Sequence, residues 1–395
     1  MLPVPGLPST SAPARPWAPL APVLSSASFR RERQHTASIL DAGQSRFVTS
    51  GRIAIGLALQ AIGIQPGDTV LMPAYHSVSM VPPVFWRGAT PRFYRVTPTA
   101  QVDLIDATAK LDASVKAILV THYFGFLQDL APIRAWCDAH GIPLIEDCAH
   151  GFFGEQAGRP VGSTGDYAIA SSMKFFPAYE GGLLASSRHS LDAIKLRPAG
   201  AAFEAKVVLN TLEYSFAYGH LPFLRMILAL PLRAKDVLWR LRKRASTPAV
   251  ALGPASSNSE AGFDTAWLDK QSSWFARMLL RRVSGTRIVA LRRAHYASLD
   301  QACADLAGAR PLHAALPDGV CPWMFPLIVD DADAVFTRLH RAGVPVTRFA
   351  EGTDASACAN SAWLQRHVLA FPCHQTLRAD ELAWLIAQIR AAVQP

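Results

Sequence analysis

The feature that most constrains this 395-residue chain is an alternation of strand-like and helix-like patterns between about residues 50 and 186. Short apolar runs there predict buried strands, and amphipathic stretches between several of them predict helices. Such alternation favours a mostly parallel α/β sheet with helices on both faces, and such sheets bind ligands at the carboxyl ends of their strands. The predicted strands are residues 69–72, 93–96, 115–120, 142–145, 167–172 and 183–186. One predicted helix begins at Ile53 and ends near Gly63, and another covers residues 130–140.

The length and the apolar content predict more than one domain. Half of the residues are hydrophobic, which is enough for a sizeable core. A strand pattern over 324–329 and helical patterns over 332–342 and 379–393 predict a smaller α/β unit near the C-terminus. We therefore expect a Pro-rich N-terminal arm over residues 1–40, flexible over 1–22, a large α/β domain over 41–199, a divergent excursion and loop over 200–262, and a small C-terminal domain over 263–395.

The positive charge of the chain is concentrated in two places. Lys and Arg number 39 against 30 Asp and Glu, a net charge of +9, and residues 225–244 and 271–299 each contribute +6. These basic residues do not alternate with aromatic residues in a recognisable motif, so we expect no nucleic-acid partner. The apolar run 215–232 is too interrupted to span a membrane. With its basic neighbours, segment 215–244 could form a peripheral membrane contact, or a helical excursion packed on the protein or on a partner subunit.

The six cysteines are scattered along the chain. They form no CxxC pair and no zinc-like spacing, so we expect no metal site. Scattered cysteines suit a reducing compartment, and residues 1–22 lack the unbroken apolar segment of a secretory signal. The sequence therefore predicts a cytoplasmic protein, with segment 215–244 as the candidate for peripheral contact at the inner membrane face.

Lys174 is one of only eight lysines, and it follows a predicted buried strand. An amine in an apolar setting loses the hydration that favours its charged form, so its pKa should fall. Schiff-base chemistry needs such a neutral amine. Gly181 and Gly182 follow closely and would let the backbone pack tightly around it. The competing interpretation is a lysine that extends its ammonium group from a strand end into solvent.

Two other stretches carry groups that suit a cofactor. Asp147 ends a predicted strand, where a carboxylate could hold a protonated ring nitrogen, although strand-end Asp residues also cap turns. His150 could donate to an oxygen of the same ring. The stretch Ser50-Gly51-Arg52 begins the first helix, whose free N–H groups form an anion site. Ser171, three residues before Lys174, could add a hydroxyl to the same phosphate.

The order of these groups resembles that of fold-type I pyridoxal 5'-phosphate (PLP) enzymes: a helix start, a strand-end Asp about a hundred residues later, then Ser-x-x-Lys. The flanking sequence is similar to that of the DegT/StrS family of sugar aminotransferases. The similarity is strong over residues 45–190 and loose over 285–395. The matching stretches are Ser50-Gly51, Leu57-Ala58-Leu59, Gly63-Ile64, Pro66-Gly67-Asp68, Gly88-Ala89-Thr90-Pro91, Gly141 to Asp147, Val161 to Asp166, Lys174 with Glu180-Gly181-Gly182, and Leu369 to His374.

The resemblance implies a fold-type I α/β transferase whose large domain binds PLP. Lys174 would attach the cofactor and Asp147 would pair with its pyridinium nitrogen. His150 would lie near the ring hydroxyl, and Ser171 with Ser50-Gly51-Arg52 would hold the phosphate. The reaction implied is transfer of an amino group, typically from glutamate, to a nucleotide-linked keto sugar for surface polysaccharide or secondary metabolism. The family forms dimers with active sites at the subunit interface, so a homodimer is implied.

The chain departs from the family pattern in places that bear on the site. The aromatic residue that stacks on the cofactor in the family falls at Ser77 here, so we expect either Tyr75 or His76 as its substitute, or no stacking residue. Arg52 stands where the family has threonine, and its guanidinium could add to phosphate binding. The family's helix with Asn and Arg after the lysine loop is not recognisable, because residues 200–262 replace it.

Other functions remain as alternatives. A non-catalytic or membrane-associated assembly protein that kept the fold would explain segment 215–244 and the lost helix, but such a protein needs none of Lys174, Asp147 and Ser171. Sugar dehydratases of the family replace the lysine with histidine, so Lys174 disfavours that reaction. A decarboxylase or acyl-transferring relative stays open. A nicotinamide enzyme is disfavoured because no GxGxxG follows the first strand.

Overall fold

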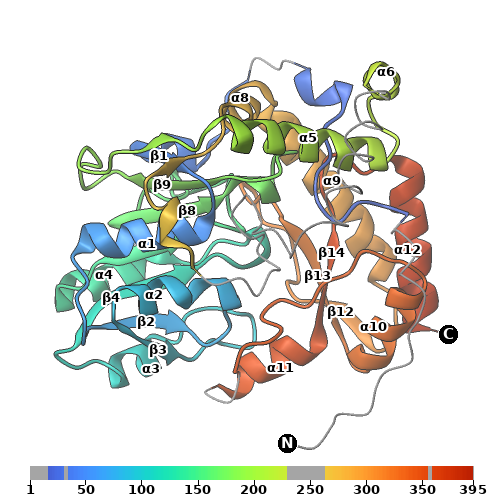
Figure 1. The fold of residues 1–395 in the computed structure, drawn as a ribbon. Coiled ribbons are helices and arrows are strands. Elements are labelled where there is room, and N and C mark those ends of the chain that lie inside the picture. The colour runs from blue at the N-terminus through green and yellow to red at the C-terminus, as the bar shows by residue number, and fades with distance from the viewer. Residues whose placement is uncertain (1–16, 31–33, 229–262, 355–357, 395) are drawn as a thin grey trace, which may run out of the picture.

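The computed structural model describes residues 17–30, 34–228, 263–354 and 358–394. Within these ranges a large mixed sheet and a smaller sheet form the framework of the molecule (Figure 1). The large sheet has the strand order β10-β11-β1-β9-β8-β5-β4-β2-β3. Its strands are β1 (Gln44–Val48), β2 (Thr69–Pro73), β3 (Thr90–Tyr94), β4 (Val115–Thr121), β5 (Leu144–Asp147), β8 (Tyr167–Ser171), β9 (Gly182–Ser186), β10 (Arg197–Pro198) and β11 (Lys270–Gln271).

Most of the large sheet is parallel, which confirms the α/β prediction. Strands β3, β2, β4, β5 and β8 run in one direction. Strand β9 is antiparallel to β8, and β1 is antiparallel to β9, so the sheet becomes mixed on that side. Because β4, β5 and β8 are parallel neighbours, their carboxyl ends meet at one edge, where ligands bind in sheets of this kind.

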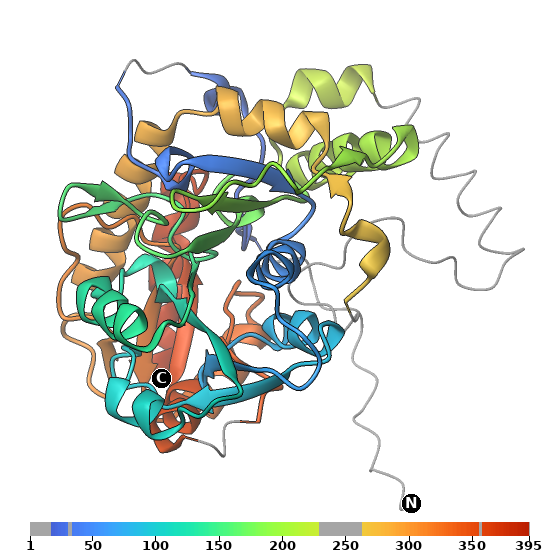
Figure 2. The ribbon, with the colours of Figure 1, turned by 90° about the vertical axis from the view of Figure 1, so that its left-hand side faces the viewer.

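Helices cover both faces of the large sheet, and the alternation of side chains along each strand sorts the core into two layers (Figures 1 and 2). Val70 and Met72 of β2 pack in the layer of α1, whereas Leu71 packs in the layer of α4. The first layer holds α1 (Gly51–Ile62) and α2 (Pro82–Trp86), and the second holds α3 (Leu104–Ala109) and α4 (Leu130–His140).

The ends of α1 and α4 follow from glycine. Gly63 and Gly141 cap these helices with φ values of +87° and +64°, a left-handed conformation that glycine adopts without steric penalty. The predicted helix over 130–140 and the predicted end of the first helix are therefore confirmed.

A three-stranded antiparallel sheet organises the C-terminal part. Its order is β12-β13-β14, and its strands share one buried cluster with Leu71 and Val120 of the large sheet. The two sheets are thus joined by a common core rather than by a solvated linker. The elements are β12 (Ala309–Pro311), β13 (Met324–Val329), β14 (Val368–Pro372), α9 (Gly285–Cys303), α10 (Ala332–Arg341), α11 (Ala359–His367) and α12 (Ala379–Val393).

The described part of the N-terminal arm is packed, so the expectation of a flexible segment over 1–22 is wrong from Trp17 onward. The ring of Trp17 lies 5.2 Å from that of Trp384 on α12. The Pro19 carbonyl lies 2.9 Å from Nε2 of His374, and the Val23 N–H donates to the Thr376 hydroxyl. Proline-rich composition predicted an arm without regular structure, but it could not show that a tryptophan anchors the arm. Residues 1–16 lie outside the described residues.

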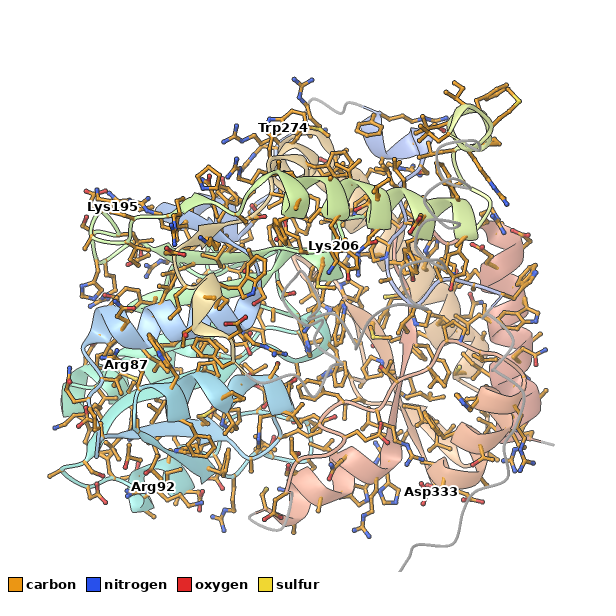
Figure 3. All side chains as sticks on the ribbon, in the orientation of Figure 1. Arg87, Arg92, Lys195, Lys206, Trp274 and Asp333 are labelled. Atoms are coloured by element: carbon orange, nitrogen blue, oxygen red, sulfur yellow. The ribbon has the colours of Figure 1, made fainter. Side chains whose placement is uncertain are left out.

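The predicted excursion begins as two helices, α5 (Ala201–Ala217) and α6 (Pro222–Ile227), and α5 packs beside α8 (Trp274–Arg282). Figure 3 shows Lys206 on α5 and Trp274 at the start of α8, while Arg87, Arg92, Lys195 and Asp333 lie at the edges of the molecule. From residue 229, segment 215–244 lies outside the described residues. Among the helices that the structure describes, none has the length and hydropathy needed to span a bilayer.

Candidate active site

The predicted site residues meet where the carboxyl ends of β4, β5 and β8 face the start of α1. Close packing of α1 against β9 depends on Gly182, because a Cβ atom there would lie 2.2 Å from the Ser50 carbonyl carbon. A cavity opens at this junction. Its lining residues are Ser50, Gly51, Arg52, Ile55, Ser77, Ser79, Met80, Thr121, Asp147, Ala149, His150, Ile169, Ser171, Met173, Lys174 and Phe349.

Lys174 ends the short helix η5 (Ser172–Lys174) directly after β8, and its side chain lines the cavity. Burial lowers the pKa of Lys174 to about 8, while the negative charge of Asp147 opposes this shift. Its Nζ lies 4.6 Å from the ring centroid of Trp323. Lys174 is half-buried, and its amine faces the cavity and the indole ring instead of extending from the strand end into solvent. With a pKa of about 8, about a tenth of this amine is neutral at pH 7.

Asp147 ends β5 and is buried. Its Oδ1 accepts from the Ala149 N–H at 2.9 Å, and its Oδ2 accepts from the Thr121 hydroxyl at 3.4 Å. Burial raises the pKa of Asp147, while the Ala149 amide and Lys174 act against that shift. Because two neighbouring strands fix its position, the carboxylate presents one orientation to the cavity.

His150 is a neutral imidazole in a ring cluster. Burial holds its pKa well below the usual range, and the positive charge of Lys174 acts in the same direction. The Phe124 N–H points at Nδ1 at 3.4 Å, so the ring proton belongs on Nε2. The ring stacks on Trp323 at 3.8 Å. His150 can therefore donate a hydrogen bond from Nε2 to a ligand oxygen.

The opposite end of the cavity carries the donors of an anion site. Ser50 caps α1, and its hydroxyl oxygen accepts from the Ile53 N–H at 3.4 Å, which leaves the hydroxyl proton to donate. Gly51 begins the helix, and Ser171 ends β8 beside it. Arg52 is buried in the cavity wall, and that burial lowers its pKa from the usual arginine value. Helix N–H groups, two hydroxyls and a guanidinium suit a phosphate group.

Tyr75 and His76 do not reach the cavity. Tyr75 is buried between Tyr123 and Phe349, at centroid distances of 5.2 and 4.9 Å. His76 stacks on Phe93 at 4.6 Å. Both follow the end of β2, where the chain turns each ring into a core layer, and Ser77 lines the cavity in their place.

Several cavity residues were not predicted from the sequence. Thr121 could have been found, because it is the last residue of the strand next to β5. Ser79 and Met80 follow Ser77 on a short helical turn, η3 (Val78–Met80). Phe349 in the cavity wall, and Trp323 beside the Lys174 amine, come from the C-terminal part, and no local pattern marks them as neighbours of Lys174.

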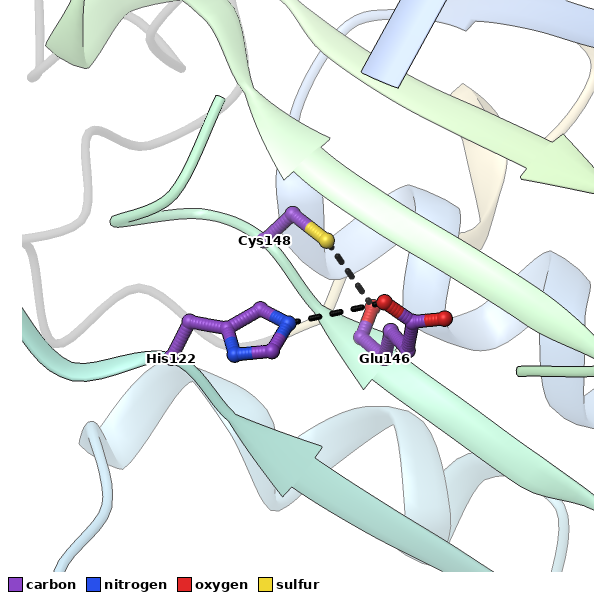
Figure 4. A group of neighbouring side chains, drawn as sticks. All are labelled: His122, Glu146 and Cys148. Carbon is purple, nitrogen blue, oxygen red and sulfur yellow. Dashed lines mark hydrogen bonds and ion pairs between the residues drawn. The ribbon is translucent and has the colours of Figure 1, made fainter. Parts of the chain in front are cut away.

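A second polar cluster lies directly behind the site (Figure 4). His122, Glu146 and Cys148 are close enough to surround an ion, but hydrogen bonds already occupy the first two. Glu146 accepts from the N–H groups of Gly162, Thr164 and Gly165, and its Oε2 lies 3.5 Å from Nε2 of His122. The Gln128 N–H donates to the other nitrogen of His122. Glu146 therefore anchors the loop before β8, while Asp147, the next residue, points to the opposite face.

Comparisons with known proteins agree with this geometry. Residues 33–205 match the model of the DegT/DnrJ/EryC1/StrS aminotransferase family. The matched region makes up a little under half of the chain, and over that region the chain is similar to this family. The family is PLP-dependent. All of the predicted site residues, from Ser50 to Lys174, fall inside the matched region.

The curated relatives match over about two fifths of the chain. GDP-perosamine synthase of Vibrio cholerae is 33% identical over 154 residues, which cover 38% of this chain and 42% of the synthase. A UDP-N-acetyl-3-dehydro-alpha-D-glucosamine 3-aminotransferase of Acidithiobacillus ferrooxidans is 34% identical over 161 residues, 38% of this chain and 41% of the enzyme. The chain thus aligns with about two fifths of the length of these relatives.

Solved structures match over most of the chain. The aminotransferase TlmJ of Streptoalloteichus hindustanus superposes with a TM-score of 0.61 and 22% identity, covering 88% of this chain and 85% of TlmJ. The PLP form of Spr1654 from Streptococcus pneumoniae gives a TM-score of 0.62 at 15% identity, covering 92% and 93%. At these identities the likeness establishes the fold, including the C-terminal part that the family model does not match.

Proposed function

We propose that the protein is a PLP-dependent aminotransferase. The observation that carries this proposal is one cavity that holds an enclosed lysine amine, a strand-end carboxylate and a helix N-terminus with serine hydroxyls. A scaffold protein needs none of these groups together.

The residues present fit PLP by their chemistry. Ser50, Gly51, Arg52 and Ser171 would take the phosphate at one end, and Asp147 would take the protonated ring nitrogen. Gly182 leaves the space in which α1 can approach the strands. When bound, PLP supplies an electron sink for electrons released at the substrate carbon.

The chain's own residues then have separate tasks. Lys174, with a pKa of about 8, can exist as a neutral amine that attaches the cofactor and carries a proton at Nζ. The Asp147 carboxylate would hold a positive ring nitrogen in place by charge, and Thr121 orients the carboxylate. Nε2–H of His150 would donate to a ring oxygen. Phe349 and Met80 form apolar wall around these groups and exclude water from them.

The substrates are proposed from the names of the relatives. GDP-perosamine synthase and the UDP-linked aminotransferase are named for nucleotide sugars. We infer a keto sugar, linked to a nucleotide, as the amino acceptor and glutamate as the donor, in surface polysaccharide or secondary-metabolite synthesis. We also infer a homodimer, from the resemblance to this family. All six cysteines are buried and free, which supports a cytoplasmic location.

Peripheral membrane contact through segment 215–244 is a separate proposal, supported by α6. Phe223, Met226 and Ile227 are 79, 69 and 70% exposed on this helix, beside the exposed Arg225. A surface of this kind suits an anionic bilayer. The test is co-sedimentation with phosphatidylserine vesicles, with phosphatidylcholine vesicles as the control. Loss of pelleting in a Phe223→Ser, Ile227→Ser double variant is expected, and equal pelleting of variant and parent would contradict the contact.

The enzyme proposal is tested by visible absorbance after purification with PLP. The protein should show a yellow band, borohydride should link the cofactor covalently to Lys174, and glutamate should bleach the band. Lys174→Ala should lack the band, whereas Lys206→Ala on α5, outside the cavity, should keep it (Figure 3). A parent protein without the band would refute the proposal and favour the assembly protein that kept only the fold.

A further inference from the structure

Among the residues that the structure describes, Arg292 is the largest side chain that is completely buried. It lies on α9, its exposed fraction is 0%, and none of the described carboxylates forms an ion pair with it. Burial lowers its pKa from the usual arginine value. An uncompensated charge in the interior is expensive, so its persistence requires hydrogen bonds that replace water.

Those hydrogen bonds all go to the segments that form the active site. One guanidinium nitrogen donates to the Lys174 carbonyl at 2.8 Å. The other donates to the Pro322 and Trp323 carbonyls at 3.2 and 2.9 Å. The Nε atom donates to Oε1 of Gln375 at 2.9 Å. The guanidinium carbon also lies 4.5 Å from the ring centroid of Phe175, the residue after Lys174.

Gln375 adds a further hydrogen bond to the backbone next to Lys174. Its amide nitrogen donates to the Phe175 carbonyl at 2.7 Å, so two consecutive carbonyls of the lysine loop are held from the C-terminal part. The same guanidinium holds the backbone of Trp323, whose ring lies 3.8 Å from His150 and 4.6 Å from Nζ of Lys174. A displacement of either backbone would change the distance between the indole and the amine.

We propose that Arg292 is a positioning residue of the active site, which holds the backbones of Lys174 and Trp323 in one frame and so keeps the lysine amine enclosed beside the indole. The proposal rests on the proposed function for its catalytic consequence, but the frame itself needs no cofactor. Only arginine has a planar fork of five donors that can reach three carbonyls and an amide together. Lysine would keep the charge but lose the fork.

The experiment measures the lysine amine directly. The full-length protein, freed of any carbonyl cofactor, is labelled with an amine-reactive reagent between pH 6 and 11, and labelling of Lys174 is quantified by peptide mass spectrometry. Asp147 and His150 are the titratable groups that act on this amine, and both stay in place. In Arg292→Lys we expect water to reach the amine and the half-labelling pH to rise by about one unit, a roughly tenfold slower reaction at pH 7.

Arg293→Lys is the matched control. Arg293 lies on the same helix but donates to the Pro317 and Val320 carbonyls, so its profile should equal the parent's. Because Arg292→Lys keeps the positive charge, a shift reports lost geometry. A folded Arg292→Lys protein with the parent's profile would overturn the proposal.

If Arg292→Lys does not fold, Gln375→Met decides the question. This variant removes one contact of Arg292 and the brace on Phe175, so a smaller rise in the half-labelling pH is expected. An unchanged profile would again overturn the proposal. Labelling does not require PLP, so a failure of the enzyme proposal would show in the absorbance test and leave this result interpretable.

Discussion

Glu180 makes the stability of the protein depend on pH in a way that the structure lets us calculate. In the sequence, Glu180 lies between Lys174 and β9, and the residue is 2% exposed. Its Oε1 accepts from the Ser272 hydroxyl and from the N–H and hydroxyl of Ser273, while its Oε2 has no hydrogen-bond partner among the described residues. Burial raises the pKa of Glu180 from 4.5 to about 7, against the effect of these hydrogen bonds.

The sign follows from the two pKa values. In the unfolded chain Glu180 loses its proton near pH 4.5, whereas in the folded protein it keeps the proton until about pH 7. Between these values the unfolded state gains stability by ionising, so the folding free energy is fully present below pH 4.5 and decreases up to about pH 7. A difference of about 2.5 units at 1.36 kcal/mol each corresponds to about 3 kcal/mol.

The assay compares urea unfolding of the parent and Glu180→Gln between pH 4 and 8. The glutamine keeps an acceptor for Ser272 and Ser273 but does not titrate. As the pH rises across this range, we expect the unfolding free energy of the variant to increase by about 3 kcal/mol relative to that of the parent. Glu155→Gln, on the exposed strand β6 (Glu155–Gln156), measures the effect of removing a surface carboxyl. If the difference in unfolding free energy between the parent and Glu180→Gln did not change with pH, the raised pKa of Glu180 would be refuted as its cause.

Three other contacts are tested by substitution. Gly182→Ala should lower the unfolding free energy by about 1–3 kcal/mol in a denaturant titration, because the new Cβ meets the Ser50 backbone. Gly51→Ala is the control and should be tolerated, because its Cβ would lie 3.6 Å from its nearest neighbour. Thr121→Val should weaken PLP binding, measured by fluorescence titration, by about 1 kcal/mol, since Asp147 loses one donor; unchanged affinity would show that Thr121 does not orient it. Trp17→Ala should reduce the melting temperature by a few degrees through lost packing on Trp384, and an unchanged melting curve would mean that the N-terminal segment contributes no stability.

The parallel strands and the polar residues at their ends could be predicted because both depend on local pattern. Lys174, Asp147 and Ser171 each follow an apolar run, and a parallel sheet brings such ends to one edge. The direction of side chains beyond a strand end is not local. Tyr75 and His76 stand beside Ser77 in sequence, yet their rings turn into core layers, which depends on Tyr123, Phe349 and Phe93.

The neighbours of the lysine amine show a second limit of local pattern. Trp323, 149 positions after Lys174 in the numbering, contacts the amine only because β13 packs against the large sheet. Nothing in its flanking residues distinguishes it from another buried tryptophan. The predicted fall in the pKa of Lys174 is confirmed, but its main cause, burial, depends on residues that the sequence pattern did not select.

The family match covers only one part of the groups around the lysine amine. The family match ends at residue 205 and contains the groups that would touch PLP, whereas Arg292, Trp323 and Phe349 lie beyond it. A lysine in the right motif is reactive only if it is desolvated, and desolvation of Lys174 comes in part from this unmatched portion. The motif therefore indicates which cofactor fits, while the C-terminal frame determines whether the amine is in the protonation state that the chemistry needs. Divergence in the C-terminal part can change reactivity without altering any residue of the motif.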